Sequence, residues 1–377
     1  MGSRLQTRIL DSLDRVSPPQ WDRLAGDNPL LSYAFLHALH ETGCACEDRG
    51  WSPLFVTLWD GEDLAGAMPL YAKAHSYGEY VFDWAWADAY HRHGLDYYPK
   101  LVCAIPFTPA AGARALAPTA ALRQQLLSAA LELAKESRAS SLHVLFPPPE
   151  QAPELESAGL MLRNGVQFHW QNPGYRDFDD FLSGMSHDKR KRIRQERRKV
   201  REAGVEFAWF NGRDATPAQW DFFTLCYNRT YRQHHSTPYL NRAFFLRLAQ
   251  TMPDNVLLIV GSRDGEPIAA ALNVHNGHTL WGRYWGAARF VSGLHFEACY
   301  YQAIEFCIAR GIRLFEGGAQ GEHKLARGFL PVATCSAHWL AHPRFSRAVE
   351  EFLDREARGM TAYLDELNEH SPFKATT

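Results

Sequence analysis

The sequence predicts an α/β protein that contains two related α/β units and a mainly helical insert. Three observations lead to this prediction. A hairpin signature occurs twice, about 200 residues apart. In each half, a stretch with helical spacing is followed by a short apolar stretch typical of a strand. Between the two halves lies a strongly basic segment, again with helical spacing. The length of 377 residues allows two domains, since a domain takes roughly 100 to 200 residues.

The repeated hairpin is centred on an Asp-Gly pair. Residues 54–58 and 256–260 are apolar, and each run leads to such a pair, ending at Gly61 in the first half and at Gly265 in the second. A second run of mainly apolar residues follows each pair. An Asp-Gly turn between two such runs is a strong short-range signal for a β-hairpin. We therefore expect one hairpin in each half.

Further matches follow the hairpins in the same order. An aromatic segment comes first and is expected to be a strand in both halves, and a Gly-Leu pair comes next. A helix and then a strand complete each copy. Several matches in one order favour a duplicated unit over chance. The matched segments are 80–87 with 280–287, 94–98 with 293–297, helices 122–138 with 295–310, and strands 142–146 with 312–315.

The boundary between the copies is expected between residues 150 and 175. Three consecutive prolines end at Pro149, and a turn signal ends at Gly174. We expect an N-terminal domain over residues 1–165 and a C-terminal domain over 166–377. The C-terminal domain would include the basic helical insert, at about residues 180–250.

Composition excludes several classes of protein. Hydrophobic residues make up 46%, and 40 Lys and Arg nearly balance 42 Asp and Glu, which argues against global disorder and against a field that drives nucleic-acid binding. No apolar run is long enough for a membrane span. The N-terminus lacks the apolar stretch of a signal peptide, and the 7 cysteines are scattered, so reduced thiols and a cytosolic location are expected. The P-loop and the Gly-x-Ser-x-Gly elbow are both missing from the sequence.

The basic segment reads as one helix between Ser186 and Gly204, which are suitable capping residues. Residues 188–202 carry nine basic and three acidic side chains. Contact between residues 189–201 and the phosphates of a tRNA or a membrane surface is one interpretation. A solvated helix that packs lightly is the other, and the balanced overall charge favours it.

Four segments resemble a known family. Residues 289–296 open a helix behind a glycine, residues 312–318 form a strand that ends in an acidic residue and two glycines, and residues 321–329 place a lysine before a Gly-Phe pair. This order is similar to the C-terminal half of the Fem-type peptidyl and aminoacyl transferases and their GNAT-superfamily relatives. Residues 77–84 resemble the FemAB-like branch, which is associated with peptidoglycan biosynthesis or recognition. The resemblance covers roughly residues 20–370.

The resemblance implies a tandem of two GNAT-like (acyl-CoA N-acyltransferase) domains. In that fold a mixed sheet splays, an acyl thioester or ester enters the gap, and an amine attacks the acyl carbon directly. The expected function is N-acyl transfer from an acyl-CoA to an amine acceptor. The alternatives are an aminoacyl-tRNA-dependent Fem-type transferase acting on a peptidoglycan precursor or peptide, and a non-catalytic recognition module. Neither a metal nor a membrane span is expected, and the oligomeric state stays open.

The donor would bind near the start of the helix that opens the second half. Arg289 adds positive charge there, and Gly293 and Leu294 begin the helix, whose N–H groups can face an anion. This segment departs from the usual GNAT pyrophosphate loop, because it has one glycine where that loop has two. An ordinary helix N-terminus is the alternative. Lys324 is expected to hold a donor phosphate or to polarise a carbonyl, since a lysine is typical of this turn in the family.

Catalytic candidates lie near the ends of predicted strands in the second half. Glu316 ends a strand and is the expected base, because ligands bind at strand ends in open sheets. The alternative is an ion pair with Lys324 or Arg327. Tyr284 could protonate the leaving group, and His323 could act as a base or proton relay.

The acceptor would contact aromatic and acidic residues. Carboxylates beside indoles suit a cationic amine, although single aromatic residues are more often part of a core. A metal site involving His234 and His235 is not supported by ligand spacing. The predicted acceptor contacts are Asp83, Trp84, Trp86, Asp88 and His91 in the first half and Trp285 in the second.

Overall fold

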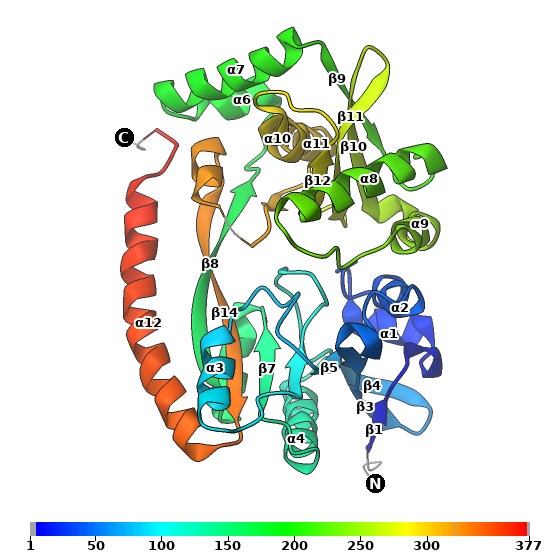
Figure 1. The fold of residues 1–377 in the computed structure, drawn as a ribbon, viewed down its shortest axis with the longest axis vertical. Helices are drawn as coiled ribbons and strands as arrows, with labels where there is room; N and C mark the ends of the chain where they lie inside the picture. The colour runs from blue at the N-terminus through cyan, green and yellow to red at the C-terminus, as the bar shows by residue number, and fades with distance from the viewer. Residues whose placement is uncertain (1–4, 320, 375–377) are drawn as a thin grey trace. The chain divides into compact units, whose positions relative to one another are not determined.

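The computed structural model describes residues 5–319 and 321–374, which form two compact units (Figure 1). Unit 1 comprises Met1–Val166 and Ala333–Tyr363, and unit 2 comprises Gln167–Val332 and Leu364–Thr377. The first change of unit lies beside the expected boundary. The units are not two contiguous segments, however, because residues 333–363 belong to unit 1. The chain changes unit within strands β8 (Met161–Gln171) and β14 (Leu330–Leu340) and within helix α12 (Pro343–Glu369).

Pairing and packing explain why the late segment joins unit 1. Residues 336–340 of β14 pair antiparallel with β7 (Ser141–Leu145). Val349 and Leu353 of α12 are buried in one cluster with Trp86 and Tyr90. Both contacts join residues that are far apart in the sequence, so local sequence patterns could not reveal them.

Unit 1 contains a small antiparallel sheet, ordered β1–β3–β4, and a mixed sheet, ordered β2–β5–β6–β7–β14. Within the mixed sheet only β6 and β7 run parallel. Helix α4 contributes Leu126 and Ala130 to the core beside Leu142 and Val144. The other elements of this unit are β1 (Gln6–Leu10), α1 (Pro18–Ala25), α2 (Tyr33–Glu41), β2 (Trp51–Pro53), β3 (Phe55–Asp60), β4 (Asp63–Met68), β5 (Leu70–Lys73), α3 (Trp84–Arg92), β6 (Lys100–Cys103), α4 (Ala120–Glu136) and α5 (Ala152–Ser157).

Unit 2 contains a mixed sheet ordered β8–β13–β12–β11–β10–β9. Its one parallel pair among the described strands is β12 with β13. The elements of this unit are α6 (Phe178–Ser183), α7 (His187–Glu202), β9 (Val205–Phe210), α8 (Pro217–Gln233), α9 (Arg242–Thr251), β10 (Val256–Arg263), β11 (Glu266–His275), β12 (Thr279–Ala287), α10 (Leu294–Phe296), a π-helical turn (Glu297–Tyr301), α11 (Gln302–Arg310), β13 (Leu314–Glu316) and a 3-10 helix (Glu322–Arg327).

The two units repeat one order of elements, which confirms the α/β prediction. In unit 1 the hairpin β3–β4 is followed by β6, α4 and the parallel strand β7. In unit 2 the hairpin β10–β11 is followed by β12, α10–α11 and the parallel strand β13. Both Asp-Gly turns and both helix–strand pairs lie where the sequence predicted them.

One expected strand is wrong. Residues 80–87 were predicted to form a strand matching 280–287, but they form a loop and the start of helix α3. Trp86 and Tyr90 are buried and stand four residues apart, which places them on one helical face. In a strand, Trp84 and Trp86 would share one face and be buried together. Trp84 is 40% exposed whereas Trp86 is buried, so the alternation does not mark a strand. The counterpart of β12 in unit 1 is β6.

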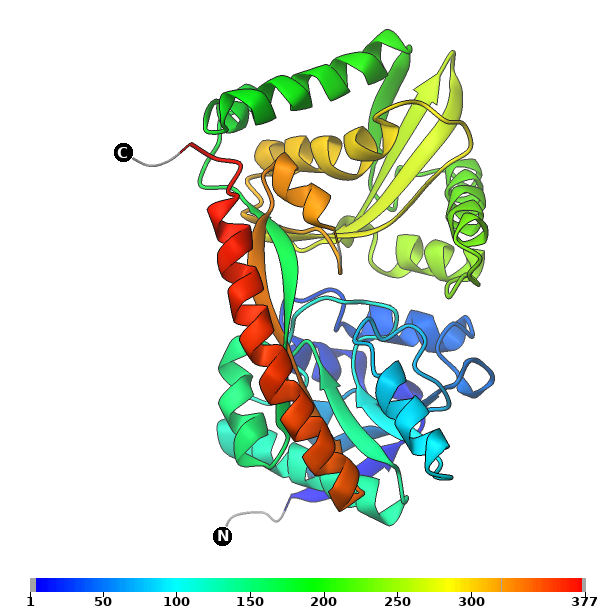
Figure 2. The ribbon, with the colours of Figure 1, turned by 60° about the vertical axis from the view of Figure 1, so that its left-hand side comes forward.

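The insert is less purely helical than expected. Helix α7 is the predicted basic helix, but the strand β9 follows it and pairs with β10. Helix α8 begins at a capping box between Thr216 and Gln219. Figure 2 shows α7 on the outer side of α11, with α8 and α9 on the other side of the unit 2 sheet. No helix in the described ranges is long and apolar enough to cross a membrane.

A buried cluster of charges occupies the core of unit 1. The Lys100 ammonium is fully buried and donates to Ser76 Oγ and Glu79 Oε2, both at 2.8 Å, and to Asp83. Asp83 also accepts a 2.7 Å hydrogen bond from the hydroxyl of Tyr97. Burial raises the pKa of Glu79 to about 7. Burial also opposes ionisation of Asp83, but the charges of Lys100 and His143 and the hydrogen bonds from Lys100 and Ser76 together outweigh burial and lower the Asp83 pKa. Lys100 is therefore the cation that Asp83 and Glu79 share, and Lys73 Nζ lies farther off, 3.9 Å from Glu79 Oε1.

Replacing Lys100 tests this balance. Lys100→Met leaves Glu79 and Asp83 buried without their cation, and removal of one partner from a buried ion pair costs about 3 to 5 kcal/mol. We expect a large loss of stability at pH 7 in chemical unfolding followed by tryptophan fluorescence, and a smaller loss at pH 5, where Glu79 takes up a proton. Lys135→Met, on the exposed side of α4, is the control. Equal midpoints for the two variants would contradict the assignment.

Candidate functional site

A cavity opens where two neighbouring strands of unit 2 part. Strand β12 pairs with β13 only through Thr279, Leu280 and Trp281. The rest of β12 continues to Ala287 after β13 has ended at Glu316. The cavity beside this point has a volume of about 110 Å³. Its lining comes from β11 (271–273), β12 (282–285), the following helix (His295, Cys299 and Tyr300) and the end of β13 (Phe315 and Gly317).

Glycines make room for this opening. A Cβ atom on Gly282 would lie 3.0 Å from the ring of Phe315, and one on Gly317 would lie 3.1 Å from the ring of Phe329. Gly318 follows with a φ of 83°, a conformation that favours glycine. The strand therefore ends in a turn that no ordinary side chain fits.

The helix after β12 supplies aromatic and polar groups to the cavity. His295 lies on Trp285, with ring centroids 4.4 Å apart. Burial lowers the pKa of His295 to about 4, so its imidazole is uncharged at neutral pH. The hydroxyl of Tyr300 lies 3.0 Å from Nε2 of His323. Cys299 and Tyr300 belong to the π-helical turn, a distortion often found at functional sites.

Lys324 is a buried cation beside the cavity. It is 3% exposed, and its Nζ donates to the carbonyl oxygen of Gly318 at 3.2 Å. A Cβ on the cavity-lining Gly317 would lie 3.3 Å from its Cδ. Burial lowers the Lys324 pKa to about 8, and none of the ion pairs among the described residues involves this side chain. A buried ammonium without a carboxylate partner is suited to an anionic or strongly polarised ligand atom.

Helix α7 is fixed to the same unit by ion pairs. Arg197 pairs with Glu297 and Glu305, each at 2.9 Å. Glu196 accepts a hydrogen bond from Arg327 at 2.8 Å and another from the hydroxyl of Tyr301. One face of α7 is thereby bound to the helix beside the cavity, while most of its other cations face outward.

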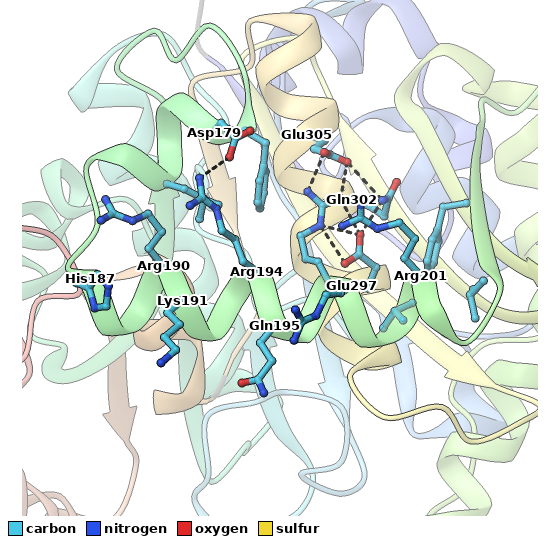
Figure 3. Close-up of a pocket in the computed structure, with 17 residues that line it drawn as sticks. Asp179, His187, Arg190, Lys191, Arg194, Gln195, Arg201, Glu297, Gln302 and Glu305 are labelled. Carbon is cyan, nitrogen blue, oxygen red and sulfur yellow. Dashed lines mark hydrogen bonds and ion pairs between the residues drawn. The ribbon is translucent and has the colours of Figure 1, made fainter.

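A groove of about 960 Å³ runs along α7 (Figure 3). Its floor includes the Arg197 ion pairs and Gln302, and Arg194 at its edge pairs with Asp179 at 2.9 Å. Among the described residues, Arg190, Lys191 and Arg201 form no ion pair with a carboxylate. The cationic residues that line the groove are Arg190, Lys191, Arg194, Arg197, Arg198 and Arg201.

The predicted donor site differs from an open phosphate cradle. Gly293 has the expected positive φ of 85°, but a Cβ there would lie 3.4 Å from the carbonyl oxygen of Glu196 and from Val200. Leu294 is buried, and its N–H donates to Val291 within the turn. Arg289 is exposed. Helix α7 thus lies against the glycine that was expected to face a phosphate.

The predicted catalytic residues are only partly gathered. Tyr284 and Trp285 line the cavity, and His323 and Lys324 lie in the turn beside it. Glu316 is buried at the end of β13, but its neighbours Phe315 and Gly317 line the cavity and it does not. This placement follows from the strand, whose successive side chains point to opposite faces.

The predicted acceptor residues of the first half all lie in unit 1. Asp83 and Trp86 are buried, the former in the Lys100 cluster. Trp84 is partly exposed, His91 is exposed, and Asp88 forms an exposed ion pair with Arg92 at 2.9 Å. No group of three possible metal ligands occurs in the described part of the chain.

Sequence reasoning missed three of the cavity groups. His295 and Tyr300 follow the predicted glycine, but the contacts with Trp285 and His323 depend on the fold. Asn273 is a polar residue inside an otherwise apolar strand, and that feature alone could have marked it.

Comparisons with known proteins identify the family and the fold. A family model described as FemAB-like, peptidoglycan biosynthesis/recognition, matches residues 12–375. The structure of FemX is similar at 10% identity with a TM-score of 0.57, over 92% of this chain and all of that one. L-PGS from Bacillus licheniformis is similar at 10% identity with a TM-score of 0.50, over 84% of this chain and 95% of that one.

A tandem GNAT protein from the clavulanic acid biosynthesis pathway is 12% identical, with a TM-score of 0.47, over 90% of this chain and 99% of that one. None of the curated proteins matches this sequence. The Fem-type tandem of GNAT-like units predicted from the sequence is confirmed.

The buried charge on Lys324 predicts a pH effect on stability. Its pKa is about 8 in the folded protein, against an ordinary 10.5. Between these values the unfolded chain holds a proton that the folded chain has released, so stability from this group rises with pH. We expect Lys324→Met to be more stable than the parent at pH 7, and we expect that advantage to shrink by about 3 kcal/mol toward pH 10.5.

Thermal or chemical unfolding of both proteins across this pH range measures the effect. Lys199→Met, which removes an exposed lysine of α7, should show a constant difference from the parent. A difference for Lys324→Met that does not change with pH would rule out the depressed pKa.

Proposed function

This chain belongs to the FemAB-like family, and from that premise we propose that it transfers an acyl or aminoacyl group to an amine of a peptidoglycan precursor or related peptide. The observation that carries the proposal is the cavity beside β12, where Tyr284 and Trp285 meet His295 beside the buried Lys324. A small cavity lined mostly by uncharged groups suits a reaction in which charge develops on a carbonyl oxygen.

The reaction forms one bond and breaks another. The amine nitrogen attacks the acyl carbon, and the C–S or C–O bond to the donor breaks. The proton lost by the amine passes to a base in the site, and the leaving thiolate or hydroxyl oxygen takes up a proton. The Tyr284 hydroxyl, which accepts a hydrogen bond from Arg283 at 3.1 Å, is our assignment for the group that protonates the leaving atom.

His295, His323 and Glu316 are all able to accept the proton, and His323 lies beside the cavity at Tyr300. His295 lines the cavity and is uncharged at neutral pH, whereas Glu316 lies outside the lining. We assign the role to His295. Lys324 then holds the donor or its carbonyl oxygen by charge, as the family resemblance implied.

The donor is the point on which geometry favours the Fem-type alternative. Gly293 faces α7, which leaves little space for a coenzyme A pyrophosphate at the helix start. The groove along α7 instead presents a row of cations (Figure 3), and such a row suits the phosphates of a tRNA. We therefore favour an aminoacyl-tRNA donor over an acyl-CoA. Of the predicted acceptor residues, Asp83 is already engaged by Lys100, whereas Trp285 lines the cavity.

Binding measurements test the donor. Arg190→Gln, Lys191→Gln and Arg201→Gln combined should lower tRNA affinity by roughly tenfold or more and reduce the slope of log affinity against log salt by about 3, or about 1 per lost phosphate contact. The combined variant Arg344→Gln, Arg347→Gln and Arg355→Gln removes the same charge from exposed positions of α12 and should retain tRNA binding. If acyl-CoA stabilises the protein, and if the α7 variant binds tRNA as tightly as the parent does, the acyl-CoA donor would be favoured instead.

Transfer assays test the base. His295→Gln should lower kcat/KM by about 10² to 10⁴, the usual contribution of a general base, whereas Glu316→Gln should lower it by less than ~10-fold. The reverse order would assign the base to Glu316, as the sequence predicted. If the protein binds a ligand but transfers no group from any donor, the non-catalytic recognition module would be the favoured function.

A further inference from the structure

The side-chain NH₂ group of Asn273 has no hydrogen-bond partner among the described residues. The residue lies in β11 and is 2% exposed. Its Nδ2 is buried without a hydrogen-bond partner, and no hydrogen bond of the side chain to another described residue is recorded. An unpaired buried amide costs about 1 to 3 kcal/mol, so folded proteins seldom retain one without a reason.

The amide lines the cavity described above. Asn273 is one of its lining residues, together with Tyr284, His295 and Cys299. Across the ladder Asn273 faces Gly282, which has no side chain to cover it. The register shifts at this point, because Leu272 pairs with Tyr284 and Asn273 with Gly282, so that Arg283 is an extra residue. Such bulges are common beside active sites, where they redirect side chains.

Among the groups that line the cavity, the Asn273 amide is a suitable uncharged hydrogen-bond donor. Burial lowers the pKa of His295 to about 4 and raises the pKa of the Cys299 thiol, so neither carries charge at neutral pH. Arg283 is directed to the hydroxyl of Tyr284 at 3.1 Å. An amide N–H that is already fixed and desolvated gains most when it meets an oxygen on which negative charge develops.

Resting on the transfer reaction proposed above, we infer that Asn273 is a catalytic residue whose Nδ2 donates a hydrogen bond to the carbonyl oxygen of the acyl group. When the amine nitrogen bonds to the acyl carbon, the electron pair of the C=O bond moves to that oxygen, and Asn273 stabilises the resulting oxyanion. The C=O bond re-forms as the bond to the donor breaks. The donor group in this cavity is thus a thioester or ester carbonyl, held in the space between Asn273 and the end of β13.

Two variants separate catalysis from structure. Asn273→Leu and Asn273→Asp both remove the amide N–H and should lower kcat by about 10² to 10³, the usual effect of losing one oxyanion donor, with KM changed by less than ~3-fold. Ligand-free Asn273→Leu should melt at or above the temperature of the parent, because the substitution removes an unpaired buried amide.

Asn172 provides the matched control in unit 2. Its amide already donates to the carbonyl oxygen of Ile312 at 3.1 Å and accepts from Gly174 and Tyr175. Asn172→Leu should therefore lower the melting temperature while kcat at a permissive temperature stays within ~2-fold, because these hydrogen bonds are structural.

Each failure has a different meaning. Unchanged kcat in both Asn273 variants, or loss of activity that only parallels loss of stability, would overturn the assignment of Asn273 while the parent still transfers acyl groups. A parent protein that transfers no acyl group from aminoacyl-tRNA or acyl-CoA would overturn the proposed function itself. Binding of a tetrahedral, transition-state analogue of the donor gives a readout without turnover, and Asn273→Leu should weaken it by about tenfold, or 1.4 kcal/mol.

Discussion

The early end of the parallel pairing between β12 and β13 is the constraint on which the site depends. After Trp281 the strand β12 continues without that neighbour, so the backbone groups on this side lose the partners that a sheet would provide. The same event opens the cavity and exposes the bulge at Arg283 to it. Gly282 and Gly317 are needed because a Cβ on either would approach an aromatic ring to within 3.1 Å. The sheet itself thus produces a gap that a ligand can enter. The helix after β12 adds side chains to the lining of that gap.

Helix α7 is held more firmly than the lightly packed, solvated helix that the balanced overall charge favoured. Its inner face is bound through Arg197 to Glu297 and Glu305, and partly buried pairs of this kind orient an element more reliably than they stabilise it. Three of the six cations that line the groove, Arg190, Lys191 and Arg201, form no ion pair with a carboxylate among the described residues. A lightly packed, freely solvated helix would not hold those cations in a fixed row, whereas the ion pairs to the helix beside the cavity do so.

The predictable part of this protein is the part encoded by local patterns. The hairpins, the helix–strand pairs and α7 follow from turn chemistry and periodicity. Helix α3 was missed because Trp84 and Trp86 alternate as in a strand, and only the burial of Tyr90 four residues later reveals the helical face. The engagement of Asp83 by Lys100, and the contact of Gly293 with α7, join segments distant in sequence. Single-sequence patterns carry no information about such pairs, and this explains why the second-half aromatic residues were placed better than the acceptor residues of the first half.

The same comparison shows how the two units differ at the end of the parallel strand pair. In unit 1 the strand β6 ends at Cys103, where its parallel pairing with β7 also ends, so no part of β6 runs on alone as β12 does. The corresponding region is filled by an apolar cluster that includes Val102, Leu145 and Phe146. The nearby carboxylates of Glu79 and Asp83 accept hydrogen bonds from Lys100. The two units therefore contain sheets with the same order of elements. Among the described residues, only the sheet of unit 2 has both a gap beside its parallel strand pair and an unpaired polar group that lines this gap.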